Sequence, residues 1–342
     1  MYSINLDTIM KYKNVVLMKR GGPEVLQIVE CELSLPTNRQ VQIKILACGL
    51  GRTDVAMRYG YYPFAPKIPF VPGYEIVGIV ESIGHEVTEI KIGDTIAALT
   101  VYGGYSEYIN LNQEHLVKVP DELDYGEAVT LILNYTTAYQ MLERVANARK
   151  GDKILITGAS GGVGTALLDL GRLKGLKMYG TASKQKHEII KKYDATPIDY
   201  KSEDIVEFIR KIEPNGLDFV FDGIGKSYIG KSFSLLGKGG KLVEYGYPDF
   251  QGMIQGLVKI GFLNALPNNR KAEFYGISGS YKKNRSIILN DLESLFVLLK
   301  ENKIKPIISK RMSLLEASEA NRVLESGSVS GKIVLMAPEL LR

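Results

Sequence analysis

The segment Lys153-Ile-Leu-Ile-Thr-Gly-Ala-Ser-Gly-Gly-Val-Gly164 decides the fold of this 342-residue chain. Its order is that of a buried apolar strand, a glycine-rich turn and the start of a helix. Backbone N–H groups at such a helix N-terminus can meet the charge of a pyrophosphate, so the segment is typical of a dinucleotide cradle. Gly161 allows the backbone to approach the phosphate, and Gly164 allows the helix to pack closely on the strand. Ala159 replaces the first glycine of the usual fingerprint.

Short apolar runs alternate with helical periodicity on the C-terminal side of this cradle. We expect strands at residues 177–181, 196–199, 217–222 and 240–245, and helices at residues 184–192, 205–212 and 227–236. Apolar runs of this length, separated by helices, are typical of a parallel sheet that is covered on both faces. The sequence therefore predicts a Rossmann domain.

The first 130 or so residues follow a different pattern. Short strands are expected at residues 41–47, 76–83, 94–99 and 105–110, with glycine turns between them, which is typical of a β-rich barrel or sandwich. Further along the chain, amphipathic helices are expected near residues 292–300 and 315–324. A final strand at residues 332–336 is expected to rejoin the first domain. A chain of this length favours two domains.

Composition excludes several classes of protein. Lys and Arg total 43 against 38 acidic residues, and this small surplus is spread along the chain, so we expect no nucleic-acid partner. The locally basic segment 303–311 is interpreted as a solvated face. No apolar run reaches the length of about 18 residues that a membrane span needs, and residues 1–12 lack a signal-peptide core. Two cysteines, Cys31 and Cys48, exclude a disulfide framework and fit a reducing compartment, so we expect a cytoplasmic protein without a membrane partner.

An ordered set of short motifs accompanies the cradle along nearly the whole chain from about residue 13. They are Ala47-Cys-Gly-Leu-Gly-Arg-Thr-Asp54, Arg58-Tyr-Gly-Tyr-Tyr-Pro63, Pro72-Gly-Tyr-Glu75, Gly103-Gly-Tyr-Ser-Glu-Tyr108, Thr137-Ala-Tyr139 and Gly331-Lys-Ile-Val-Leu335. With them the chain resembles the medium-chain dehydrogenase/reductase superfamily, in its zinc-independent, quinone oxidoreductase-like (zeta-crystallin-like) branch.

The resemblance implies an α/β fold in which a Rossmann doubly wound parallel sheet is joined to a GroES-like β-rich domain. Residues 1–134 and 277–342 would form the GroES-like substrate and catalytic domain, and residues 135–276 would form the Rossmann NADP(H)-binding domain. The resemblance also implies a homodimer or a higher homo-oligomer.

The resemblance places three substitutions at the zinc-ligand positions of the superfamily. Zinc-dependent members carry Cys and His before the Thr-Asp pair, where this chain has Gly51 and Arg52, and His before Glu75, where it has Tyr74. A catalytic zinc takes about three protein ligands, and Glu75 is the one candidate left. We therefore expect no metal site. Without a Lewis acid, an enone or a quinone is the acceptor best suited to direct hydride transfer.

Two residues are candidates for catalysis. Tyr62 matches the tyrosine of the Gly-x-Tyr-Pro segment, which resembles a cleft-lining loop of quinone and enoyl reductases, and it could donate a proton to the developing enolate. The alternative, that Tyr62 is only an aromatic wall of the pocket, stays open. Arg52 either points into the space that a metal would fill and pairs with Glu75, or turns to solvent.

The charge around the second strand of the Rossmann domain favours NADPH over NADH. NAD-specific domains end this strand with Asp or Glu, whereas residues 180–186 contain neither and include Lys184 and Lys186. Lysines at a helix N-terminus favour an anion such as a 2′-phosphate. In the resemblance, the residues that contact this phosphate are Ser183, Lys186 and Tyr200, and the residues that approach the nicotinamide are Thr137 and Ser278. The cradle itself comprises Ala159, Ser160, Gly161, Gly162, Val163 and Gly164.

Together these features predict a zinc-independent, NADPH-dependent reductase of quinones or α,β-unsaturated carbonyls. Two alternatives remain open. One is a carbonyl or alcohol dehydrogenase of the same superfamily, and the other is a non-catalytic NADPH-binding interaction protein.

Overall fold

The computed structural model describes residues 10–341, which divide into two compact units. Unit 1 contains the N-terminal part of the chain up to Val129, Lys310–Gly327 and the residues from Ile333 onward. Unit 2 contains Thr130–Ser309 and Ser328–Lys332. Most of the N-terminal stretch considered above, residues 1–9, lies outside the described part of the chain.

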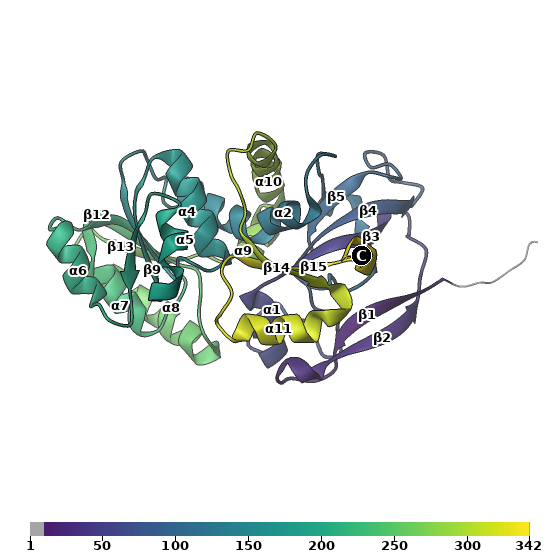
Figure 1. Cartoon of the computed structure of the whole chain (residues 1–342), viewed down its shortest axis with the longest axis horizontal. Coiled ribbons are helices and arrows are strands. Elements are labelled where there is room, and N and C mark those ends of the chain that lie inside the picture. Colours follow the sequence, from purple (N-terminus) through teal and green to yellow (C-terminus); the bar gives the residue numbers. More distant parts are fainter. Residues whose placement is uncertain (1–9, 342) are drawn as a thin grey trace, which may run out of the picture. The chain divides into compact units, whose positions relative to one another are not determined.

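Unit 1 is built around a seven-stranded β-sheet, seen in Figure 1. Its strands follow the order β14-β15-β3-β4-β5-β7, and β6 pairs with β3. The last strand, β15, runs antiparallel to β3, which confirms that the C-terminal strand rejoins the first domain. The bounds are β3 Gln40–Leu50, β4 Glu75–Ile83, β5 Thr95–Leu99, β6 Tyr108–Asn112, β7 Leu116–Lys118, β14 Ile308–Ser313 and β15 Lys332–Met336.

A hairpin and several helices complete unit 1. The hairpin consists of β1 (Lys11–Leu17) and β2 (Leu26–Glu32), and the helices include α1 (Arg52–Tyr59) and α11 (Ala317–Glu325). The strand expected at residues 105–110 begins only at Tyr108. Residues 105–107 bond mainly to β1: Val15 N donates to Tyr105 O at 2.8 Å and Glu107 N donates to Lys13 O at 3.0 Å. One bond to β3 remains, from Ile45 N to Glu107 O at 2.9 Å.

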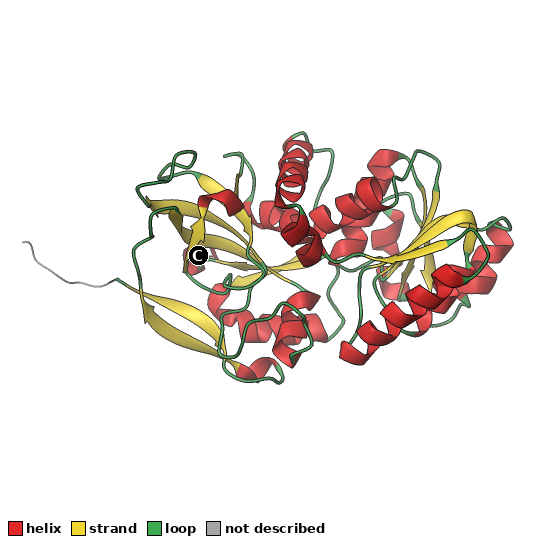
Figure 2. Ribbon diagram, turned by 180° about the vertical axis from the view of Figure 1, so that it is seen from behind, coloured by secondary structure: helices red, strands yellow, loops and turns green. Residues whose placement is uncertain are grey.

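Unit 2 contains a six-stranded parallel sheet with the order β10-β9-β8-β11-β12-β13. Helices lie on both faces of this sheet (Figure 2), as the alternating pattern predicted. The strand order reverses at β8, which has β9 on one side and β11 on the other, and dinucleotides bind at such a reversal. The strands are β8 Lys153–Thr157, β9 Lys177–Ala182, β10 Thr196–Asp199, β11 Leu217–Asp222, β12 Leu236–Glu244 and β13 Lys271–Phe274.

The helices of unit 2 alternate with its strands. They are α3 Thr136–Tyr139, α4 Gly162–Lys174, α5 His187–Lys191, α6 Ile205–Ile212, α7 Ser227–Ser234, α8 Phe250–Ala265, α9 Ile277–Lys283 and α10 Arg285–Lys300. Short turns of 3-10 or π-helix adjoin several of them, and α2 (Tyr125–Thr130) lies at the boundary between the two units. Among the described residues, no helix combines the length and the apolar character that a membrane crossing requires.

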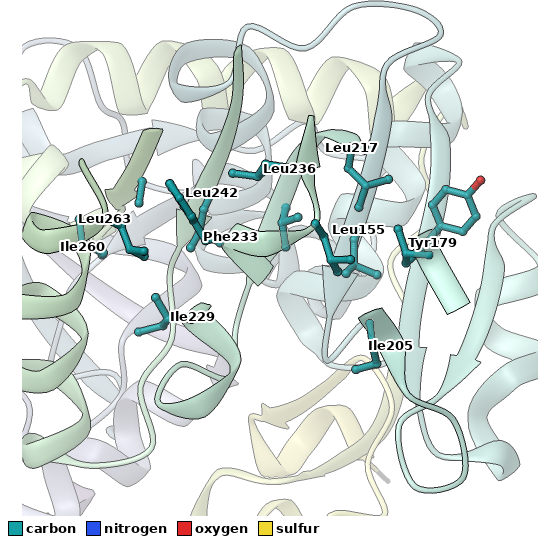
Figure 3. Packing of buried hydrophobic residues seen from close by; sticks show 14 of the residues in the cluster. Leu155, Tyr179, Ile205, Leu217, Ile229, Phe233, Leu236, Leu242, Ile260 and Leu263 are labelled. Carbon is teal, nitrogen blue, oxygen red and sulfur yellow. The ribbon is translucent and has the colours of Figure 1, made fainter. Parts of the chain in front are cut away.

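The core of unit 2 forms where one face of the sheet meets α6, α7 and α8. Figure 3 shows Leu155 and Leu242 from the sheet together with Ile205, Phe233 and Ile260 from these helices. Each of these five side chains is at least nine-tenths buried. Burial of this apolar surface is the main source of stability for the unit.

Further details differ from the sequence-based expectations. The helix expected at residues 227–236 ends at Ser234, because Leu236 already pairs with Leu217 as the first residue of β12. Residues 277–309, which were grouped with the GroES-like domain, lie in unit 2. They stay there because α10 packs against α3, and Asp291 of α10 accepts a hydrogen bond from Arg144 Nε at 2.8 Å.

Helix α8 carries a row of exposed apolar side chains. We define this α8 face by Phe250, Ile254, Leu257, Val258 and Phe262, which are 45 to 69% exposed. The five positions recur at helical spacing, so they form one stripe rather than scattered residues. The stripe lies in unit 2 next to β13, the edge strand that α8 contacts.

Replacing Gly164 by Ala should destabilise the protein. A Cβ at this position would lie 2.5 Å from Gly158 O and 2.7 Å from Ala159 Cα, and both are backbone atoms that cannot rotate away. We expect a loss of about 1–3 kcal/mol, as for other overpacked sites, measured by urea denaturation. The control is Gly261→Ala in α8, where nothing lies within 4 Å of the added Cβ. That variant should gain up to about 1 kcal/mol from helix propensity, so equal effects of the two substitutions would contradict a packing role for Gly164.

Candidate cofactor and catalytic site

The glycine turn of unit 2 has the geometry of a phosphate cradle. Strand β8 ends at Thr157, Gly158 adopts a left-handed conformation with φ of +66°, and α4 begins at Gly162 after the N-cap Gly161. Gly158 N donates to Thr181 Oγ1 at 3.1 Å and Ala159 N donates to Thr181 O at 3.0 Å, so β9 fixes the turn. The amides of the first turn of α4 have no acceptor within the helix and are available to an anion.

The structure explains why Ala159 can replace the first glycine of the fingerprint. Ala159 is fully buried, and a Cβ added to Gly180 of β9 would lie 2.7 Å from the Ala159 Cβ. The methyl group of Ala159 therefore occupies the space that Gly180 leaves by having no side chain. The methyl group of Ala159 and the missing side chain of Gly180 therefore complement each other, and the turn packs closely on β9.

Two buried polar atoms beside the cradle have no protein hydrogen-bond partner in the described part of the chain. They are Asn134 Nδ2 and Thr137 Oγ1, which lie one helical turn apart. A Cβ on Gly162 would approach Asn134 Nδ2 to 2.4 Å, so this amide lies directly against the first turn of α4. Buried polar atoms usually have partners, and a ligand in the cradle could supply them. Thr137 was predicted from the resemblance, whereas Asn134 was missed, because no motif marked it.

The residues expected to hold a 2′-phosphate follow the ends of two adjacent strands. Ser183 comes directly after β9 and Tyr200 directly after β10, and the two strands pair in parallel with Ala182 opposite Asp199. Lys186 lies in the same turn as Ser183, to whose carbonyl its N–H donates at 2.8 Å. Its ammonium donates to Val329 O at 2.6 Å, and burial lowers the pKa of Lys186. Ser183, Lys186 and Tyr200 thus belong to one edge of the sheet.

A carboxylate near this edge turns its oxygens toward its own loop. Asp199 accepts from Lys201 N at 3.1 Å and from Ser202 Oγ at 3.0 Å. The backbone hydrogen bond from Lys201 is the main cause that lowers the pKa of Asp199. Both carboxylate oxygens of Asp199 therefore accept hydrogen bonds within their own turn rather than being directed at a ribose. Ser278, the remaining predicted contact, is buried in the first turn of α9.

In unit 1, the candidate catalytic side chain Tyr62 contacts a second tyrosine. The hydroxyls of Tyr62 and Tyr74 are 2.6 Å apart, and their rings meet edge to face with centroids separated by 5.9 Å. Tyr62 is half-buried and Tyr74 is fully buried. Phe64 also packs edge to face on Tyr62, at 6.1 Å between ring centroids. The sequence motifs pointed to Tyr62, whereas they marked Tyr74 only as a lost zinc ligand.

Asp54 joins the two segments that carry the substituted ligand positions. Its Oδ2 accepts from Gly51 N at 2.9 Å and its Oδ1 accepts from Gly73 N at 3.1 Å, and the side chain is buried. Because hydrogen bonds to a carboxylate are stronger than neutral ones, Asp54 fixes the start of α1 against the loop that leads to Tyr74. The Thr-Asp motif in the sequence was the signal of this role, although the sequence did not reveal what Asp54 binds.

Arg52 and Glu75 lie in different environments. Arg52 is exposed at the first residue of α1, whereas Glu75 is completely buried at the start of β4. This placement agrees with the alternative in which Arg52 turns to solvent. Within residues 10–341 there is no group of three or more His, Cys, Asp or Glu side chains that could hold a metal ion.

Two carboxyl groups at the ends of β11 and β12 have opposite surroundings. Asp222 accepts hydrogen bonds from Thr157 Oγ1 at 2.7 Å and from Gly225 N at 3.1 Å. Glu244, opposite it in the register, is buried against α8, and its Oε2 has no hydrogen-bond partner in the described chain. Burial, reinforced by the negative charge of Asp222, raises the pKa of Glu244 to about 8. Glu244 is therefore neutral at pH 7.

Comparisons with known proteins extend over both units. Residues 37–121 match the alcohol dehydrogenase GroES-like domain family, and residues 194–335 match the zinc-binding dehydrogenase family. The chain is 32% identical to the synaptic vesicle membrane protein VAT-1 homolog of Danio rerio, over 95% of this chain and 70% of that protein. It is 28% identical to the quinone oxidoreductase of Homo sapiens, over 92% of this chain and 95% of that protein.

A solved structure adds the similarity in three dimensions. The quinone oxidoreductase of Escherichia coli, in complex with NADPH, superimposes with a TM-score of 0.85 at 27% sequence identity. The match covers 95% of this chain and 99% of that one.

The raised pKa of Glu244 makes stability depend on pH. When the chain unfolds, the carboxyl recovers an ordinary pKa near 4.5, so between about 4.5 and 8 the unfolded state binds fewer protons than the folded state. The free energy of unfolding should therefore fall as the pH rises through this range and level off above it. Glu244→Gln, which cannot ionise, removes this contribution, so the variant should gain stability over wild type with rising pH. A pH-independent difference between the two urea denaturation curves would contradict the assignment.

Proposed function

Because the chain belongs to the medium-chain dehydrogenase/reductase superfamily, among relatives of VAT-1 and quinone oxidoreductase, we propose that it is a zinc-independent, NADPH-dependent reductase of quinones or α,β-unsaturated carbonyls. The membership and the Rossmann and GroES-like architecture confirm the superfamily and the fold class predicted from the sequence. Membership in the superfamily does not by itself establish the activity, the cofactor or the acceptor. The proposals for these three are based on the residues described above.

The observation that carries the proposal is the cradle at the reversal of the strand order. The turn after β8 presents free amides of α4, and the buried polar atoms of Asn134 and Thr137 lie beside it. These features fit a dinucleotide. The absence of a carboxylate in residues 180–186, together with Lys186, favours a phosphorylated ribose and therefore NADPH. When bound, NADPH supplies a hydride to the acceptor.

The acceptor class follows from the residues at the former ligand positions. Gly51, Arg52 and Tyr74 offer no thiolate or imidazole to a zinc ion, which in zinc-dependent enzymes polarises an alcohol or ketone oxygen. Conjugated carbonyls and quinones depend less on polarisation of their oxygen by a metal ion, because the negative charge left by hydride addition delocalises onto that oxygen. We propose that Tyr62 donates the proton that completes the reduction. Arg52 is exposed at the start of α1, so we assign the proton transfer to Tyr62 alone.

We further propose a homo-oligomer in the cytoplasm. The α8 face is an exposed apolar stripe beside the edge strand β13, and such contiguous patches are typical of association surfaces. Cys31 and Cys48 form no disulfide in the described chain, as suits a reducing compartment. The name of the Danio rerio relative refers to the synaptic vesicle membrane, so cell fractionation is the direct check of the location.

The purified protein should consume NADPH when it is given enones or quinones. We expect the saturated ketone or the hydroquinone as the product, and we expect a metal chelator to leave the rate unchanged because no ion takes part. The measurement is NADPH absorbance with a panel of acceptors, followed by product identification. Formation of an allylic alcohol, or a rate that a chelator abolishes and zinc restores, would favour the alcohol or carbonyl dehydrogenase. Tight NADPH binding without turnover of any acceptor would favour the interaction protein.

Lys186→Ala should narrow the preference for NADPH over NADH. A charge-assisted hydrogen bond to phosphate contributes about 1.5–3 kcal/mol, so we expect NADPH affinity to fall by roughly tenfold or more, with NADH affinity nearly unchanged. Fluorescence titration of both cofactors provides the comparison. Lys192→Ala, which changes an exposed lysine further along the same segment, is the matched control and should change neither affinity. Equal affinities of the wild-type protein for the two cofactors would sink the assignment.

A further inference from the structure

The contact between Tyr62 and Tyr74 joins the proposed proton donor to a residue that solvent does not reach. The two hydroxyl oxygens are 2.6 Å apart, a short distance for neutral O–H···O bonds. Tyr74 is 0% exposed, whereas Tyr62 is half-buried. A hydroxyl carries one proton, so within this pair one tyrosine donates and the other accepts.

Hydrogen bonds fix the backbone that carries Tyr74, and the ring itself is completely buried. Thr100 N and Val101 N both donate to Tyr74 O at 3.0 Å, and the preceding residue, Gly73, donates its N–H to Asp54 at 3.1 Å. A Cβ on Gly73 would lie 2.5 Å from Tyr105 N, so the chain also passes very close to the neighbouring segment at this point. Tyr74 is therefore the fixed member of the pair. Tyr62, on the segment that follows α1, is the member whose orientation the pair can determine.

We propose that Tyr74 is a positioning residue that donates its hydroxyl proton to Tyr62 Oη, an arrangement in which the proton of Tyr62 is directed at the acceptor rather than at Tyr74. The proposal rests on the proposed function, in which Tyr62 is the acid. If the direction of the bond were reversed, the proton of Tyr62 would be directed at Tyr74 and would not be aligned for transfer. The position that carries a metal ligand in zinc-dependent relatives would here supply a hydrogen-bond donor to a phenol.

The proton transfer balances without a further reagent. Once the acceptor has been reduced and carries negative charge, the O–H bond of Tyr62 breaks and the proton forms a new bond to the α-carbon or oxygen of the acceptor. Tyr62 is left as a phenolate, and the hydrogen bond from Tyr74 stabilises that charge, because hydrogen bonds to ions are stronger than hydrogen bonds between neutral groups. Solvent then returns a proton to Tyr62. Tyr74 keeps its own proton throughout.

The test is a double-mutant cycle with Tyr62→Phe and Tyr74→Phe, measured in single-turnover reduction of an enone with NADPH bound. Removing the acid itself should slow the reaction by about a hundredfold. Removing only the hydrogen bond to it should slow the reaction by about tenfold. The double variant should be no slower than Tyr62→Phe, because Tyr74 acts through Tyr62.

We expect KM for NADPH and the thermal midpoint to stay close to wild type in each variant. Tyr108→Phe, which removes the hydroxyl of another buried tyrosine of unit 1, is the control and should keep the full rate.

The outcomes separate this inference from the function on which it rests. If Tyr62→Phe is slow and Tyr74→Phe has the wild-type rate, the role of Tyr74 is refuted and the proposed acid survives. If Tyr62→Phe keeps the wild-type rate, the roles of both tyrosines are refuted, whereas the proposed reductase activity stands. If the wild-type protein reduces neither enones nor quinones, the proposed function is refuted as well. Independent, multiplicative losses in the double variant would show that Tyr74 acts elsewhere. A Tyr74→Phe protein that does not fold would also overturn the inference, because the hydroxyl would then be needed for the barrel rather than for Tyr62.

Discussion

The close approach of α4 to the turn after β8 is the constraint on which unit 2 depends. At Gly164 the helix comes so near that an added methyl group would lie 2.5 Å from a backbone oxygen of the turn. This proximity directs the first amides of α4 at the place where the strand order reverses, and it lets the β9 side chain Thr181 bond the turn from the other side. The same geometry that packs the domain therefore forms the proposed anion site. The close packing at Gly164 and the proposed binding of an anion therefore depend on the same turn.

Unit 1 uses a different device to place its polar groups. A single buried carboxylate, Asp54, accepts N–H groups from both Gly51 and Gly73, which belong to segments separated by a helix and a long loop. Both segments carry positions at which the sequence resemblance places zinc ligands in zinc-dependent relatives, and Asp54 holds these two segments together. At one of these positions the chain holds a phenol, Tyr74, against Tyr62 at 2.6 Å.

Two buried carboxyl groups of unit 2 show how neighbours decide whether a side chain is charged. Burial alone would raise the pKa of Glu213, but hydrogen bonds from Lys153, Lys177 and Tyr179 outweigh it and lower this pKa to about 2. Glu244 has no comparable set of donors, and its pKa rises to about 8. Unit 2 thus keeps Glu213 ionised where donors converge and Glu244 neutral where they do not.

The sequence by itself determined most of the secondary structure, because local patterns report local forces. The runs at residues 196–199 and 205–212 match β10 and α6 to the residue, and the glycine turn was placed correctly, since only glycine permits such close approach. The tertiary structure decided what depends on contacts across the chain. It put residues 277–309 in unit 2 through the packing of α10 on α3, and it started β6 at Tyr108 because β1 binds the residues before it. It also brought Asn134 against Gly162 and Tyr74 against Tyr62, and no periodicity encodes such pairs, because a side chain meets a distant partner only after both have folded.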